Sequence, residues 1–396
     1  MPASPSTARA INDRLALRLL QQEGPLTAGQ LKTKTGLSRP TVADLVERLQ
    51  ESGLIQVVGE SGAERRGPNA RLYGIVADRA HLAALDVRTQ SVSVVVADLL
   101  GVTLAEASLP IGSDTGTEPA VERAVALLER TAEAAGAARL HSVGIGAPGL
   151  IDPVTGELRD TSGLPAWHRR LVAALQERLP ARVVVENETN MAAVAEQRLG
   201  AAHDRDTFVF LWLGHGVGAA LFLDGRLRRG ASGGAGEIGF LPVPGTAGVP
   251  SAVDCDGGFH SLAGAAAICA LAAQYGIEGT DSQEPLAAGL VGAAVTAGRG
   301  DFLDALSRRL ALGVAAVAAV LDPGCVVLGG EVGHAGGADL AGRVQARLAE
   351  LSPLHTEVRA GKLGGAAVLS GALLSAREAA QEELFAPGAG MRAVLG

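Results

Sequence analysis

The stretch Leu213-Gly-His-Gly-Val-Gly-Ala-Ala-Leu-Phe-Leu-Asp-Gly225, continued by Arg229-Gly-Ala-Ser-Gly-Gly-Ala-Gly-Glu237-Ile-Gly239, decides the fold of most of this chain. Residues 207–213 are apolar after Thr207, glycines follow at positions 214, 216 and 218, and residues 219–224 form a second apolar run that ends at Asp224. Two apolar runs joined by a glycine-rich turn predict a β-hairpin.

The same order of elements occurs twice along the chain. Upstream, period-two patterns predict three antiparallel strands at 82–87, 91–99 and 102–109, and alternating helices and strands follow each hairpin. Two such rounds predict a duplicated α/β domain with a cleft between two lobes. The expected helices are 119–135, 169–179, 190–199, 301–321 and 366–384, and the expected single strands are 142–145, 182–185 and 325–328.

The first 80 residues have a different, mostly helical pattern. Apolar residues recur every four positions from Ile11 to Leu19 and predict a first helix. Thr27 and Gln30 have the form of a capping box for a second helix that ends near residue 35. Ser38 is the expected N-cap of a third helix. Strand patterns at 54–58 and 70–75 follow, so the head is predicted to be a winged helix-turn-helix domain.

The distribution of charge supports a DNA-binding head. Residues 1–80 contain 11 Lys/Arg and 8 Asp/Glu, which leaves 23 basic and 34 acidic residues for the rest of the chain. A basic head on an acidic body indicates a ligand-controlled DNA-binding protein. The alternative is a small helical subdomain that only packs on the body. Arg39 and Thr41 are predicted to contact DNA bases, and the wing arginines are predicted to contact the DNA backbone or minor groove. The full set of predicted DNA-binding residues is Ser38, Arg39, Thr41, Arg48, Arg65 and Arg66.

Composition narrows the class of protein further. The three cysteines, Cys255, Cys269 and Cys325, are too few for a disulfide framework. No signal-peptide pattern is present, and the longest apolar run, 310–320, is too short to cross a bilayer. We therefore expect a cytoplasmic protein without a membrane partner.

From residue 81 onward the sequence resembles the ROK family, which groups sugar-responsive repressors with bacterial sugar kinases. The quoted stretch carries the resemblance, together with Gly144–Asp152 and Val185-Glu-Asn-Glu-Thr-Asn190. The resemblance implies a two-lobed, actin-like ATPase fold with a sugar held between the lobes. It divides the chain into a winged domain at 1–76, a first lobe at 77–200 with the returning segment 366–396, and a second lobe at 201–365.

The residues argue against the kinase activity of that family. Kinases similar to this chain have an Asp followed by two glycines, Thr and Lys, where this chain has Asp86-Val87-Arg88-Thr89-Gln90. Val87 and Arg88 would crowd a nucleotide, and Glu188 stands where the resemblance places a catalytic Asp. A base displaced by about an ångström costs roughly a hundredfold in rate. We expect no catalytic residues, and we expect Asp86 to be a satisfied turn carboxylate.

The resemblance also implies an effector site between the lobes. Amide and carboxylate groups suit the hydroxyls of a polyol; helix capping or hydrogen bonding between lobes is the other interpretation of Asn187, Glu188 and Glu237. Glu186 is expected to be a solvated charge at a strand end. The predicted effector-binding residues are Gly163, Asn187, Glu188, Glu237, Phe240 and His260.

A structural zinc ion common in the family is not expected here. Phe240 replaces the usual His ligand, and Cys255 is the only thiolate of the usual three in the segment 254–262. Cys255, His260 and a carboxylate could still hold zinc, but we predict no metal and no cofactor. Loss of polar ligands also predicts that the effector is an amino or N-acyl sugar, a disaccharide or a sugar phosphate rather than plain glucose.

Together these features predict a repressor of carbohydrate uptake or catabolism genes that a sugar releases from DNA. Its expected partners are double-stranded operator DNA, the effector and a second copy in a homodimer or tetramer, with a hinge at 75–83. A sugar kinase with a fused DNA-binding head is the alternative and would bind nucleotide. A purely structural DNA-binding protein with a vestigial body would bind all sequences alike.

Overall fold

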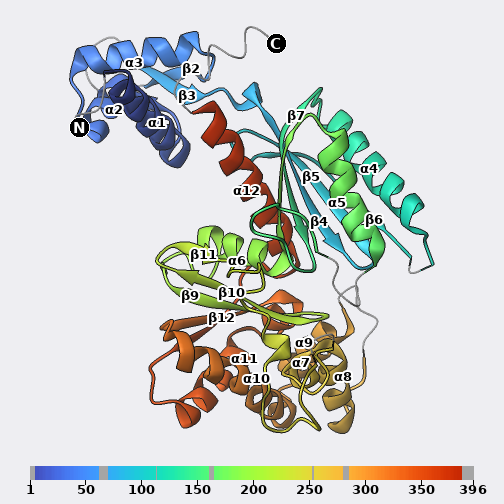
Figure 1. Cartoon of the computed structure of the whole chain (residues 1–396). Coiled ribbons are helices and arrows are strands. Elements are labelled where there is room, and N and C mark those ends of the chain that lie inside the picture. The colour runs from blue at the N-terminus through green and yellow to red at the C-terminus, as the bar shows by residue number, and fades with distance from the viewer. Residues whose placement is uncertain are drawn as a thin grey trace.

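The computed structural model describes residues 5–61, 70–112, 114–159, 165–251, 254–279 and 285–385. A small helical head packs at one end of a body that contains two sheets stacked with helices (Figure 1). The order of these parts along the chain is the predicted one: the winged head comes first and two α/β units follow.

The head is the predicted winged helix-turn-helix. Its helices are α1 (Pro5–Glu23), α2 (Ala28–Thr35) and α3 (Arg39–Glu51), and its strands are β1 (Leu26–Thr27), β2 (Ile55–Ser61) and β3 (Ala70–Ile75). Thr27 and Gln30 form the capping box at α2, which ends at Gly36 in a left-handed conformation. The sequence did not indicate β1, which is two residues long and depends on pairing with β3. The wing tip that carries Arg65 and Arg66 lies outside the described residues.

The first body sheet has the strand order β6-β5-β4-β7-β8. Its three predicted antiparallel strands are confirmed, and two parallel strands extend them through β4. Helices α4 (Thr117–Ala134) and α5 (Ala166–Arg178) cover one face, with their apolar sides in a common core. The strands are β4 (His81–Arg88), β5 (Ser91–Asp98), β6 (Thr103–Pro110), β7 (Leu140–Ala147) and β8 (Arg182–Asn187).

The second sheet repeats this design with the order β11-β10-β9-β12-β13. The quoted glycine-rich stretch forms the predicted hairpin, β9 (Phe208–Leu213) and β10 (Val217–Leu223). The remaining strands are β11 (Arg226–Arg228), β12 (Cys325–Gly329) and β13 (Glu357–Ala360). Its outer layer contains α7 (His260–Ala263), α8 (Ala265–Gln274), α9 (Leu286–Thr296), α10 (Gly300–Leu321) and α11 (Gly330–Leu351).

Helices α6 (Glu188–Leu199) and α12 (Ala367–Leu384) lie between the two sheets (Figure 1). One apolar cluster joins both helices to β4 on one side and to β9 and β12 on the other. The helices approach so closely that a Cβ at Gly371 would lie 1.8 Å from the Met191 carbonyl oxygen. A second cluster joins the end of α12 to the core of the head. Helix α12 therefore contacts the head and lies at the boundary between the lobes.

No helix among the described residues is long and apolar enough to cross a membrane.

Candidate DNA-binding face and interlobe site

The N-terminus of α3 presents the predicted base-reading residues. The Ser38 hydroxyl caps α3 by accepting from the Thr41 backbone N–H, and the two hydroxyl oxygens are 2.8 Å apart. This bond orients the Thr41 side chain, which is half-buried. Arg39 is exposed and makes no hydrogen bond or ion pair with any residue that the structure describes. A free guanidinium at the start of a recognition helix is suited to bidentate contact with a guanine.

The Arg48 side chain, predicted to point outward as a DNA contact, instead forms ion pairs within the head. Its guanidinium donates to Asp13 of α1 at 2.6 Å and to Asp44 one turn earlier in α3. Two carboxylates on neighbouring helices hold this side chain against α1, so it joins the helices of the head. The local pattern of α3 could not show this, because Asp13 lies 35 residues away.

In the body, Arg88 is the centre of a charged cluster between the lobes. Its Nε donates to Asp86 at 2.8 Å, its Nη1 to Glu331 at 2.7 Å and its Nη2 to the Gly365 carbonyl at 3.0 Å. Asp86 and Arg88 belong to β4 of the first lobe, whereas Glu331 is in the first turn of α11 in the second. Arg88, at the end of β4, thus links the two lobes directly.

Asp86 is only partly satisfied, which corrects the expectation of a fully satisfied turn carboxylate. It is 3% exposed and its Oδ1 has no hydrogen-bond partner among the described residues. Burial raises the pKa of Asp86, although Arg88 opposes the change. The sequence did not single out Glu331; the available signal was an acidic residue directly after the strand-end pair Gly329-Gly330.

Glu188 begins α6 beside this cluster. The residue is half-buried, and its carboxyl group has no hydrogen-bond partner among the described residues. Burial, and secondarily the charge of Asp86, raise the pKa of Glu188 to about 8. A largely protonated carboxyl group can both donate to and accept from a ligand hydroxyl.

Asn187 has the capping role that was the alternative to ligand contact. Its Oδ1 accepts from the backbone N–H groups of Thr189 and Asn190, and its Nδ2 donates 2.9 Å to the Gly149 carbonyl. These bonds fix the start of α6 against the loop that follows β7. Ligand contact by Asn187 remains a prediction.

Glu186 is buried, so the expectation of a solvated strand-end charge was wrong. It is 5% exposed and accepts from the Asn187 backbone N–H, from Asn190 Nδ2 at 2.9 Å and from Arg229 Nε. Arg229 follows β11 of the second lobe, so this is a second ion pair between the lobes. The strand pattern did not show it because the partner comes from a loop 43 residues away.

Glu237, Phe240 and His260 lie around the second hairpin. Glu237 precedes a short 3-10 turn at Ile238–Phe240 that packs against β10 and α7, and His260 begins α7. The Glu237 carboxyl group is accessible to solvent, although the surrounding protein raises its pKa. Phe240 is 38% exposed. Gly163 lies outside the described residues.

The residues near His260 do not fit a closed zinc site. No group of three His, Cys, Asp or Glu side chains among the described residues has the arrangement to hold a metal ion. Burial raises the pKa of the Cys255 thiol, which disfavours the thiolate that zinc requires.

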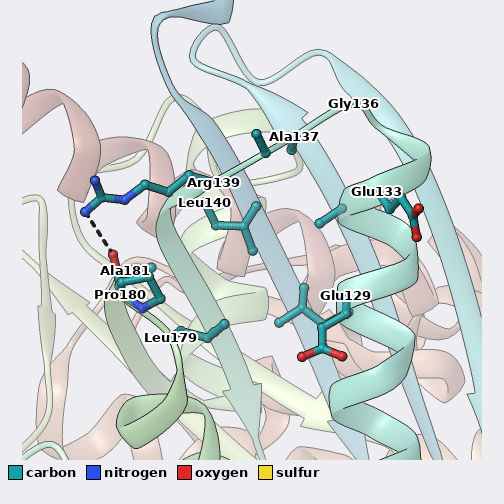
Figure 2. Close-up of a pocket in the computed structure, with 12 residues that line it drawn as sticks. Glu129, Glu133, Gly136, Ala137, Arg139, Leu140, Leu179, Pro180 and Ala181 are labelled. Carbon is teal, nitrogen blue, oxygen red and sulfur yellow. Dashed lines mark hydrogen bonds between the residues drawn. The ribbon is translucent and has the colours of Figure 1, made fainter.

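A separate hollow of about 500 Å³ lies between α4 and the segments that precede β7 and β8 (Figure 2). Arg139 donates across it to the Pro180 carbonyl at 3.4 Å. It is at the amino ends of β7 and β8, whereas Asn187 and Glu188 lie at the carboxyl end of β8. Ligands of open α/β sheets bind at carboxyl ends, so this hollow lies at the opposite end of the sheet from the predicted effector-binding residues.

Two α/β lobes joined through shared helices, behind a winged head, define a two-lobed actin-like body fused to a DNA-binding domain. Residues 82–379 match the ROK family, and residues 9–56 match the winged helix-turn-helix DNA-binding family. This chain therefore belongs to the ROK family.

Known proteins similar to this chain include both regulators and kinases. The DNA-binding transcriptional dual regulator NagC of Escherichia coli (strain K12) and the N-acetylglucosamine repressor of Escherichia coli O157:H7 are each 27% identical over 239 residues. That alignment covers 59% of this chain and 58% of each relative, so this chain matches little more than half of their length.

Among solved structures, a ROK family transcriptional regulator described as a homologue of the Escherichia coli MLC protein has a TM-score of 0.76 at 22% identity. It covers 98% of this chain and 100% of its own, so the fold includes the head. A ROK family glucokinase from Streptomyces griseus, in complex with glucose and AMPPNP, has a TM-score of 0.62 at 26% identity and covers 76% of this chain and 100% of its own.

Proposed function

We propose that this chain is a sugar-responsive transcriptional repressor of carbohydrate uptake or catabolism genes. The observation that carries the proposal is the position of α12. One end of this helix shares a core with the winged head, and the rest packs between the sheets of the two lobes. A ligand that changes lobe closure would move α12 and the head together, because packed helices transmit displacement.

The effector is a sugar or sugar derivative held between the lobes. Glu188 and Glu237 offer carboxyl groups to its hydroxyls, and Phe240 supplies an exposed apolar surface for an acyl or second sugar group. The N-acetylglucosamine repressor among the relatives supports an N-acyl sugar as the first candidate. Plain glucose fits less well, because the Phe240 side chain cannot form hydrogen bonds with the hydroxyl groups of glucose.

The protein does not phosphorylate its effector. Arg88 ends β4 beside the first hairpin turn, and Glu331 places a carboxylate beside it at the N-terminus of α11. A carboxylate repels phosphates from a helix end that otherwise attracts them. ATP-dependent phosphorylation of any sugar, abolished by Glu188→Ala, would contradict this conclusion.

The repressor binds its operator as a homodimer or tetramer. Winged proteins commonly read two half-sites spaced by one helical turn or a multiple of it, so two heads are required. Arg39 and Thr41 read bases, with Arg65 and Arg66 of the wing on the backbone or minor groove. An allosteric coupling of about 1–3 kcal/mol weakens DNA binding roughly 5–150-fold.

The decisive experiment is a fluorescence-anisotropy titration of DNA from upstream of the gene, at fixed salt, with and without a panel of sugars. Specific binding that one N-acyl sugar weakens at least fivefold is expected. Equal binding to unrelated DNA, with no response to any sugar, would leave the structural DNA-binding alternative.

Two variants separate the two halves of the proposal. Arg39→Ala should lower operator affinity about 5–150-fold and flatten base preference, by the loss of about 1–3 kcal/mol. Arg130→Ala on α4, an exposed arginine of the first lobe, is the control and should leave DNA binding intact. Glu237→Gln should keep operator affinity and lose the response to sugar.

A further inference from the structure

A crevice of about 420 Å³ lies between the head and the body. It is formed by α1 on one side and by the C-terminal halves of α6 and α12 on the other. In Figure 1, α1 lies on the side of the head that faces α12, while α3 runs along the far side. None of the predicted DNA-binding or effector-binding residues borders this crevice.

Four arginines border the crevice with few opposing charges. Arg14, Arg18 and Arg198 are exposed and make no hydrogen bond or ion pair with any described residue. The fourth, Arg377, is half-buried and donates to the Leu100 carbonyl at 3.1 Å. Of the two glutamates that border the crevice, Glu382 has a counter-ion in Arg182 at 3.5 Å. The crevice therefore carries a net positive charge.

Arg198 and Arg377 are also close enough to repel one another. Burial, and secondarily the charge of Arg198, lower the pKa of Arg377, although Glu378 partly opposes this. Gln381 adds a further donor: its Nε2 is buried and has no hydrogen-bond partner among the described residues. Guanidinium groups and an unpaired amide donor lie around one space, an arrangement that suits an anion with several acceptor oxygens.

We infer that this crevice binds a small phosphorylated anion through Arg14, Arg18 and Arg198. A phosphate group accepts paired hydrogen bonds from guanidinium forks and would neutralise the repulsion among the arginines. Because α1 belongs to the head and α6 and α12 to the body, the bound anion would join the two parts. The crevice is thus a second ligand site, separate from the interlobe site, and its existence does not depend on the identity of the sugar effector.

The test is isothermal titration calorimetry of the full chain with inorganic phosphate, glucose 6-phosphate and glucose at constant ionic strength. The double variant Arg18→Gln/Arg198→Gln should weaken binding of a phosphate-containing ligand at least tenfold. Both residues lack intramolecular partners, so this variant should fold. The matched control, Arg130→Gln/Arg226→Gln, removes the same charge from exposed positions on α4 and β11 and should change binding less than twofold.

Saturable binding of inorganic phosphate that the crevice variant weakens shows that the phosphate group alone is recognised. Binding of glucose 6-phosphate only, with the same loss, shows that a phosphosugar is the ligand. The inference is overturned if neither inorganic phosphate nor glucose 6-phosphate binds saturably. It is also overturned if the crevice variant and the control variant bind these ligands equally well.

Two further outcomes also overturn it. Glucose 6-phosphate binding that survives in the crevice variant but is lost in Glu237→Gln would place the phosphosugar between the lobes, which leaves the proposed function intact. Loss of operator affinity by the crevice variant in phosphate-free buffer, without phosphate binding by the wild type, would assign these arginines to DNA.

Discussion

The hairpins β4–β5 and β9–β10 occupy equivalent places in the two lobes, but their turns differ in chemistry. The first hairpin has Arg88 at the end of β4, beside its turn, whereas the second has glycines at 214, 216 and 218 in and beside its turn. Both turns meet the same carboxylate. Arg88 Nη1 is 2.7 Å from Glu331 Oε1, and a Cβ at Gly214 would lie 2.9 Å from Glu331 Oε2.

This difference shows that two similar hairpins can present different chemistry to the boundary between the lobes. In the first lobe the Arg88 guanidinium joins the lobes directly by donating to Glu331. In the second lobe the three glycines carry no side chain, and a Cβ at Gly216 would meet nothing within 4 Å. Substitutions in the two hairpins should therefore have unequal effects.

The largest effect is expected for Arg88→Ala. The substitution leaves Asp86 and Glu331, whose side chains are only 4% and 14% exposed, without their shared cation. Loss of one partner of a buried pair costs about 3 kcal/mol in the free energy of unfolding, measured by urea denaturation. Arg228→Ala beside the second hairpin breaks only a surface pair with Asp224 and should cost about 0.5 kcal/mol or less. Equal losses would remove the contrast between the hairpins.

A pH-dependent effect is expected for Glu188→Gln. The pKa of Glu188 is about 8 in the folded protein against an ordinary 4.5, so the folded state holds this proton more tightly. The resulting stability is complete below about pH 4.5 and is lost as the pH rises through 8. The stability of the wild type relative to the variant should therefore fall by up to about 3 kcal/mol between pH 5 and 8. Urea denaturation at several pH values measures this, and a constant difference would show that Glu188 is fully solvated.

Within the second hairpin, Gly214→Ala should destabilise more than Gly216→Ala. A Cβ at Gly214 would lie 2.7 Å from Trp212 Nε1 in addition to its contact with Glu331, whereas nothing lies within 4 Å of a Cβ at Gly216. We expect a loss of about 2 kcal/mol for the first substitution and about 0.5 kcal/mol for the second. Thermal unfolding of both variants measures the difference, and similar melting temperatures would show that the turn can move away from Glu331.

A smaller effect than for Arg88→Ala is expected for Arg229→Ala at the other interlobe ion pair. Arg229 is 52% exposed, and Glu186 keeps its bonds to Asn187 and Asn190 when the arginine is removed. The expected loss is about 1 kcal/mol. A double-mutant cycle with Glu186→Gln measures the interaction free energy between Arg229 and Glu186. A coupling as large as that of Arg88 with Glu331 would show that both ion pairs hold the lobes equally.

Most elements were predictable because their patterns are local. The capping box at Thr27, the N-cap at Ser38 and the alternating strands of both hairpins depend on residues within a few positions of each other. Helices α7, α8, α9 and α11 and strand β13 were not assigned. Their segments are rich in alanine and glycine or are short, so periodicity is weak there and packing against the second sheet decides.

By itself, the sequence determined the class of domain at each end and the duplicated hairpins. It also determined that Val87 and Arg88 stand where the family resemblance places two glycines. These features follow from residue type and spacing along a few turns of backbone. Only the tertiary structure decided where Arg88, Arg48 and Glu186 find their partners, and that α12 contacts the head as well as both lobes. Those contacts join residues from 35 to 243 positions apart. No local pattern encodes such pairs, because they depend on how separate elements pack.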